Sequence, residues 1–198
     1  MSLRNTLLVL TMTFGASAFA DTMVYTYTGT GSGSVGSTNF SGAAITISQT
    51  VDTANQVFIT ISSFAIDATS AQISIAGVGT FDFVTATRTF FWPGTGLIGF
   101  SRTDSEGGYD LYNSVNGVPS LVGWDMATPI GPVSYGFAFK QWDLLPVQTS
   151  GGVITLDAAQ VAGTFQAVRV ATAVPEPAEL SITLLSITSF LAFRKRRR

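Results

Sequence analysis

The sequence Ala43-Ala-Ile-Thr-Ile-Ser48, followed by Gln56-Val-Phe-Ile-Thr-Ile-Ser62, decides the fold class. In both segments apolar and hydroxylated residues alternate with a period of two, which is the pattern of a half-buried β-strand. The Asp-Thr-Ala-Asn sequence at 52–55 suits a turn, because Asp and Asn side chains hydrogen-bond to nearby backbone groups. We therefore predict a hairpin whose inward side chains are Ile45, Ile47, Val57, Ile59 and Ile61.

Similar short segments recur throughout residues 21–173, and the best helical candidate, at 156–162, is too short to be convincing. The Gly/Ser run at 29–34 fits either a flexible loop or a strand whose small residues lie close to another backbone. About ten to twelve short strands at this spacing predict a single all-β domain, an antiparallel β-sandwich or jelly roll. Further candidate strands lie at 23–28, 73–78, 79–84, 86–92, 97–102, 109–112, 121–124, 133–139, 153–156 and 161–168.

The composition excludes several classes of function. The chain has no cysteine and no histidine, so disulfides, zinc sites with these ligands, and Ser-His or Cys-His dyads are all ruled out. Residues 21–173 carry four basic and ten acidic side chains, a net charge of −6. An acidic domain of this kind is a poor partner for nucleic acid or anionic lipid.

The amino end has the features of a secretory signal peptide. Arg4 lies in a short cationic region, and an apolar run follows at residues 7–14. Ala18 and Ala20 then meet the small-x-small rule for signal peptidase, which predicts cleavage before Asp21. We therefore expect residues 1–20 to be removed and the chain to be exported.

The carboxyl end combines three features in a fixed order. Val174, Pro175, Glu176 and Pro177 should be extended, because proline lacks a backbone donor and restricts the residue before it. Residues 178–193 follow as an apolar run that would be about 24 Å long as a helix, short against a hydrocarbon thickness of about 30 Å. Five cations end the chain and favour the cytoplasmic side: Arg194, Lys195, Arg196, Arg197 and Arg198.

This tail resembles the PEP-CTERM sorting signal of bacterial exported proteins. The resemblance covers residues 174–198 and implies a transmembrane sorting helix recognised by an exosortase, which cuts near the motif. It further implies an inner-membrane intermediate followed by delivery to the cell surface or extracellular space, in association with exopolysaccharide and biofilm. The expected organisation is thus a signal peptide at 1–20, a β-sandwich ectodomain at 21–173 and a sorting segment at 174–198.

One local acidic cluster could hold a metal ion. Asp104, Glu106 and Asp110 surround a Gly-Gly turn, and calcium needs several oxygen ligands on a tightly bent backbone. The acids do not follow the EF-hand spacing, so a solvated hairpin turn is favoured over calcium. No other cofactor is expected.

Aromatic residues offer a second kind of candidate site. Trp92, Trp124 and Trp142 could stack on sugar rings, with neighbouring carboxylates and amides accepting hydroxyl hydrogen bonds. Core packing is the favoured role for each ring, and Trp142 is expected to be the most exposed because its neighbours are polar. A glycoside hydrolase needs only two facing acids, but none of the ten acids lies in a recognisable motif.

The leading hypothesis is a non-enzymatic protein of the cell surface or extracellular matrix. Signal peptidase and an exosortase are its expected partners, with the membrane a partner before processing. The alternatives are a carbohydrate-binding module for exopolysaccharide and, less favoured, a carboxylate-dependent glycoside hydrolase.

Overall fold

The computed structural model describes residues 21–103 and 108–170. These residues form eleven β-strands and one short 3₁₀ helix, η1, at Pro119–Leu121. The strands are β1 (Thr22–Val35), β2 (Thr38–Thr60), β3 (Ser63–Ile75), β4 (Gly79–Asp82), β5 (Thr87–Trp92), β6 (Leu97–Arg102), β7 (Asp110–Ser114), β8 (Ile130–Phe139), β9 (Val147–Thr149), β10 (Gly152–Leu156) and β11 (Ala159–Arg169).

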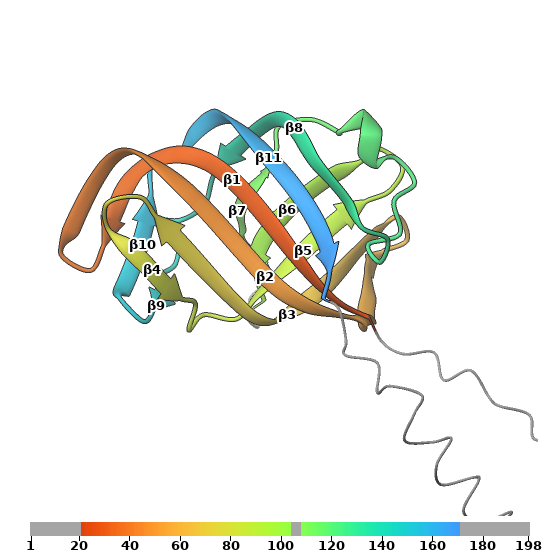
Figure 1. The fold of residues 1–198 in the computed structure, drawn as a ribbon, viewed down its shortest axis with the longest axis horizontal. Helices are drawn as coiled ribbons and strands as arrows, with labels where there is room; N and C mark the ends of the chain where they lie inside the picture. Colours follow the sequence, from red (N-terminus) through yellow and green to blue (C-terminus); the bar gives the residue numbers. More distant parts are fainter. Residues whose placement is uncertain (1–20, 104–107, 171–198) are drawn as a thin grey trace, which may run out of the picture.

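Eight of these strands close into an antiparallel barrel (Figure 1), in the order β1-β2-β3-β5-β6-β7-β8-β11. Pairing of the first strand with the last closes it, from Met23 opposite Arg169 to Thr28 opposite Thr164. The expected sandwich or jelly roll is therefore wrong. A sandwich keeps two separate sheets with free edges, whereas here the β1–β11 ladder joins the two edges of one sheet.

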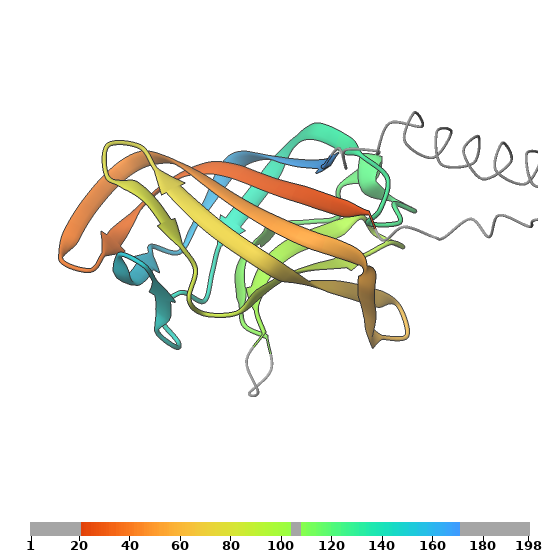
Figure 2. The ribbon, with the colours of Figure 1, turned by 60° about the horizontal axis from the view of Figure 1, so that its bottom comes forward.

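The long strands β1, β2 and β3 run past the barrel. Together with the short strands β4, β9 and β10 they form an extension at one end (Figure 2). The far half of β1 leaves β11 and pairs with β10, so that Gly33 lies opposite Leu156. The end of β3 pairs with β4, and β9 pairs with β10. Gly33 is required at this junction, because a Cβ there would lie 2.1 Å from the carbonyl oxygen of Thr155. The Gly/Ser run is thus a strand in close contact with another backbone.

The predicted hairpin at 43–62 is wrong, although both of its segments are strand. Both segments belong to one long strand, β2, and the chain reverses at Ile61 and Ser62. The Asp52 carboxylate does accept a hydrogen bond from the backbone of Ala54 (2.9 Å), but this local bond accompanies an irregularity in the β2–β3 pairing and does not end the strand. Ile45 and Ile47 are buried as predicted, whereas the three distal residues expected inside, Val57, Ile59 and Ile61, are exposed.

Other strand predictions are confirmed to different degrees. Residues 97–102 coincide with β6, and 133–139 lie within β8. Residues 121–124 are not a strand, because the chain turns at Pro119 into η1 and then into a loop. The short strand β9 was not predicted, since its three residues are too few to show alternation.

The barrel interior is filled by aromatic side chains. Tyr27 lies at the centre, with its ring 5.0 Å from that of Phe165 and 6.2 Å from that of Tyr112. Its hydroxyl bonds to Thr89 Oγ1 (2.9 Å) and donates to the carbonyl of Gly99 (3.2 Å). These side chains are buried, and their polar atoms are hydrogen-bonded to one another. The interior of the barrel is therefore a packed core.

None of the helices within residues 21–103 and 108–170 has the length and apolar character needed to cross a membrane. The expected transmembrane sorting helix therefore has no counterpart in the described part of the chain. Its own residues, 178–193, lie outside that part, as does the signal peptide at 1–20.

Candidate functional site

The three tryptophans do not form a shared sugar-binding platform. Trp142 is 1% exposed and its indole donates to the carbonyl of Leu111 (2.6 Å), so the expectation of an exposed ring is wrong. Trp124 is 8% exposed and donates to the carbonyl of Thr128 (2.7 Å). Trp92 is half-buried and meets the ring of Phe90 edge-on at 5.3 Å. Two of the three rings are thus committed to the core.

The calcium candidate falls largely outside the described residues, because Asp104 and Glu106 are among those not described. Asp110 is described and half-buried, and one of its carboxylate oxygens accepts a bond from the Asn113 amide (3.1 Å). Burial raises the pKa of Asp110, while the positive charges of Lys140 and Arg88 act in the opposite direction. Within the described ranges, no cluster of three acidic side chains is placed to hold a metal ion.

The predicted processing signals also lie outside the described residues. These are the cleavage residues Ala18 and Ala20, the motif at 174–177 and the basic tail at 194–198. The first strand begins at Thr22, shortly after the predicted cleavage position. The last strand ends at Arg169, shortly before the motif.

The outer face of the barrel, continued by the neighbouring strand β4, carries two rows of polar side chains, which we call the hydroxyl face. The first row crosses six strands through successive antiparallel pairs: Ser134, Thr164, Thr28, Thr46, Ser74 and Thr80. The second row crosses five: Gln166, Thr26, Ser48, Gln72 and Asp82. Neighbouring strands are about 4.8 Å apart and alternate residues about 6.7 Å apart, so the two rows form a regular grid.

Hydrogen bonds between neighbouring strands hold parts of this grid in place. The hydroxyl groups of Thr28 and Thr164 lie 2.7 Å apart, and Thr80 donates to Ser74 (2.9 Å). In the second row the Gln72 amide donates to the Asp82 carboxylate (2.7 Å). Because the strands are fixed within a closed barrel, these side chains present their remaining hydrogen-bonding capacity at set positions.

Two adjoining hollows deepen the hydroxyl face where β8 and β11 meet. One, of about 650 Å³, is lined by Asn116, Tyr135 and Gln160 among others. The second, of about 500 Å³, lies over β1, β2 and β11 and includes Thr28, Thr30 and Thr46. Both are bordered by Ser134, Ala162 and Gly163, so we treat them as one groove.

The groove carries no formal charge, because none of its lining residues is Asp, Glu, Lys or Arg. Its polar groups are hydroxyls and amides, which both donate and accept hydrogen bonds. An uncharged groove of this kind suits a neutral polyhydroxylated ligand better than an anion or a cation. It also lacks the two facing carboxylates that a glycoside hydrolase requires.

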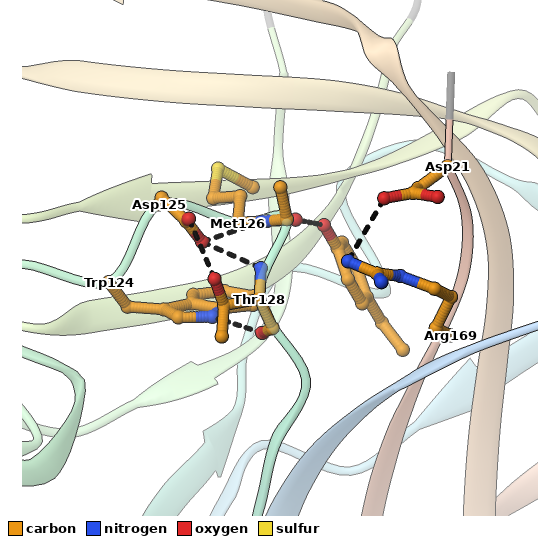
Figure 3. A network of polar contacts seen from close by, with 8 residues as sticks. Asp21, Trp124, Asp125, Met126, Thr128 and Arg169 are labelled. Atoms are coloured by element: carbon orange, nitrogen blue, oxygen red, sulfur yellow. Dashed lines mark hydrogen bonds and ion pairs between the residues drawn. The ribbon is translucent and has the colours of Figure 1, made fainter. Parts of the chain in front are cut away.

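A separate polar network closes the barrel end where β1 begins and β11 ends (Figure 3). Asp125 accepts bonds from the backbone of Ala127 (2.9 Å) and from the backbone and hydroxyl of Thr128 (2.7 and 2.8 Å). Burial by itself would raise the pKa of Asp125, but these bonds lower it below its ordinary value. Nearby, Arg169 pairs with Asp21 at 3.0 Å. This network supports the loop, and the hollow beside it, of about 280 Å³, is smaller than either hollow of the groove and includes the charged Asp125.

The hydroxyl face was not predicted from the sequence, although its signal is present. The Thr residues of Tyr25-Thr-Tyr-Thr28 and of Ile45-Thr-Ile-Ser48 mark the outer side of two strands. Which outer residues become neighbours depends on strand register, and register here is set by barrel closure.

No protein-family model, curated protein or solved structure matches this chain.

Proposed function

We propose that this chain is an exported, non-enzymatic protein of the cell surface or extracellular matrix, delivered by an exosortase that recognises Pro175-Glu176-Pro177 and the basic tail. The order of signal peptide, barrel, motif and cationic end supports this proposal. The barrel suits an external environment, because it is held by packing and hydrogen bonds without any cysteine that could be oxidised.

Mass analysis of the protein from its native surface fraction tests this proposal. The expected product begins at Asp21 and lacks the C-terminal segment, with or without a group attached to its new end. A matched pair of variants sharpens the test: Glu176→Gln should leave the segment in place, whereas Asp157→Asn, in the exposed turn between β10 and β11, should not. Recovery of mature wild-type protein that still ends at Arg198 would disprove the proposal.

A second proposed function is binding of a neutral exopolysaccharide by the hydroxyl face. The observation that carries it is the uncharged groove across β8, β11, β1 and β2. Hydroxyl and amide groups at regular spacing can exchange their bonds to water for bonds to a polyol chain. The packed interior supports an external site for such a ligand.

Affinity electrophoresis in gels containing neutral glucans would measure this binding. Ala162→Trp places a large side chain on an exposed residue of the groove and should abolish the retardation. Ser70→Trp is the matched control, because Ser70 is an exposed residue of β3 that lines neither hollow. Equal retardation of both variants and the wild type would exclude the groove as the site.

A further inference from the structure

The end of the β2–β3 hairpin, residues 56–64, exposes a cluster of large apolar side chains, and we call this segment the hairpin tip. Ile61 is fully exposed, and Phe58 is 74% exposed. Val57 and Ile59 add further exposed apolar surface. Exposed apolar clusters of this size normally mark a contact surface, because removing apolar side chains from water lowers the free energy.

The hairpin tip is apolar on both of its sides and carries no charge. Val57, Ile59 and Ile61 alternate with Phe58 along the strand, and alternate residues of a strand point to opposite sides. The ring of Phe58 packs on that of Phe64 at 4.6 Å, which enlarges the apolar surface on its own side. No residue from 56 to 64 is Asp, Glu, Lys or Arg.

The base of the hairpin tip lies beside both ends of the described chain (Figures 1 and 2). The backbone of Thr53 donates to the carbonyl of Asp21 (3.1 Å), and that of Val170 donates to the carbonyl of Thr22 (2.8 Å). The chain therefore continues toward its C-terminal segment from the same end of the barrel at which the tip projects.

We propose that the hairpin tip inserts into the membrane interface while the C-terminal segment holds the exported chain at the bilayer. This inference rests on the proposed sorting function. The apolar run at 178–193 begins eight residues after Val170, so its start lies within about 30 Å of that barrel end even for a fully extended chain. Such a short connection keeps the end that carries the tip close to the bilayer.

The bilayer fits this position better than a second copy of the chain does. Two chains held side by side on one membrane would direct their tips at the membrane rather than at each other. The charges around the base do not favour anionic lipid, because Asp21, Asp52 and Asp67 outnumber Arg88 and Arg169. Insertion therefore depends on apolar contact, and it should be insensitive to salt and occur on uncharged phosphatidylcholine vesicles.

The absence of cysteine allows a direct test on the full chain with a solvent-sensitive fluorophore at a single introduced cysteine. Ser62→Cys places the label in the turn of the hairpin tip. Ser37→Cys, in the exposed β1–β2 turn at the opposite end, is the control (Figure 1). On vesicles, the Ser62 label should shift to the blue and be quenched several-fold more by lipid-borne nitroxides than the Ser37 label.

Replacing Phe58 and Ile61 by Ser in the Ser62→Cys chain should lower that quenching about tenfold or more, because burial of one such side chain is worth at least a factor of ten. Unchanged emission from the buried Trp124 and Trp142 would show that the barrel is intact. A Ser62 label that stays in water on vesicle-bound protein would overturn the proposal. If the Ser62 label is shielded from water in the absence of vesicles, and dilution of the protein reverses this, the proposal would be overturned in favour of self-association.

The label measurements test tip insertion independently of the sorting function. A chain that fails to bind the vesicles overturns tip insertion, whereas the sorting function is judged by the mass of the surface protein. Conversely, retention of residues 174–198 in the mature protein would leave the label measurements fully interpretable.

Discussion

At the scale of single residues, the barrel is specified by buried polar groups as much as by apolar ones. Gln49 is fully buried, and its amide donates to Thr87 (3.1 Å) while its carbonyl accepts from Thr89 (2.6 Å). The Thr89 hydroxyl lies 2.9 Å from that of Tyr27. Such a connected network favours one strand register, because any slip would leave buried groups without partners.

Tyr27→Phe should therefore lower the free energy of unfolding by about 1–3 kcal/mol, since the carbonyl of Gly99 loses a donor inside the core. Urea denaturation followed by tryptophan fluorescence measures the change. Tyr135→Phe is the control, because Tyr135 is only partly buried and should change stability by less than about 0.5 kcal/mol. Equal effects of the two substitutions would contradict the role of the network.

Glycine has a defined packing role at Gly163, where a Cβ would lie 2.4 Å from the Thr28 carbonyl and 2.5 Å from the Tyr112 hydroxyl. That hydroxyl donates to the same carbonyl (2.7 Å), so the space is already used. Gly163→Ala should destabilise the barrel by about 1–3 kcal/mol through overpacking. Gly136→Ala, opposite Ala162 on the next strand, should be neutral or stabilising, because its nearest neighbour would be 3.9 Å away. Matched thermal melts compare the two variants.

Buried tyrosines give the protein a predictable response to alkali. Burial raises the pKa of Tyr25, Tyr27 and Tyr112 well above the ordinary value of about 10. The stability linked to these groups is fully present below pH about 10 and is lost as the pH rises further, because the unfolded chain releases their protons first. Absorbance titration should therefore show these three ionising together with cooperative unfolding. Their gradual ionisation in a chain with native circular dichroism would contradict this expectation.

At the scale of elements, the loop from Trp124 to Thr128 acts as a lid on one barrel end. Met126 is fully buried and has a φ of 62°, a left-handed conformation that is costly for a residue with a side chain. The Tyr25 hydroxyl donates to its carbonyl, and Asp125 fixes the following residues (Figure 3). The loop is thus held by specific bonds on both sides of the strained residue.

Asp125→Ala should lower the free energy of unfolding by about 0.5–1.5 kcal/mol at neutral pH, because several bonds to one carboxylate are lost. The folded pKa of Asp125 is lowered, so this stability is present above the unfolded value of about 4 and is lost as the pH falls through the folded value. Denaturation curves across acidic pH measure both effects. Asp157→Ala, another exposed acid, serves as the control, and an equal loss from it would argue against the loop bonds.

At the scale of the whole molecule, closure depends on contacts that are far apart in the sequence. Thr28 and Thr164 are 136 positions apart, yet their hydroxyl groups touch across the β1–β11 ladder. Contacts of this kind require a large loop to close before they stabilise anything, so the barrel should fold in milliseconds to seconds. Stopped-flow refolding with emission from Trp124 and Trp142 as the probe measures the rate. Completion in microseconds would show that local contacts dominate instead.

The sequence predicted strands well wherever one face of the strand is buried and the other is exposed to solvent. Residues 97–102 and the inward side chains Ile45 and Ile47 are examples, because their period-two pattern follows directly from burial on one side. The same reasoning failed at Val57, Ile59 and Ile61, whose alternation is intact although the strand has left the barrel. Alternation reports a possible buried face and cannot report whether another element covers it.

Residue patterns along the chain were enough to establish the all-β class and the absence of thiol and imidazole chemistry, and they predict export and sorting signals. Tertiary structure alone decided that the sheet closes on itself, that Trp124 and Trp142 are core residues, and that the hydroxyl rows become one surface. The physical reason is that strand pattern is fixed by neighbours along the chain, whereas closure, burial and row alignment are fixed by the register between β1 and β11, which lie at opposite ends of the domain.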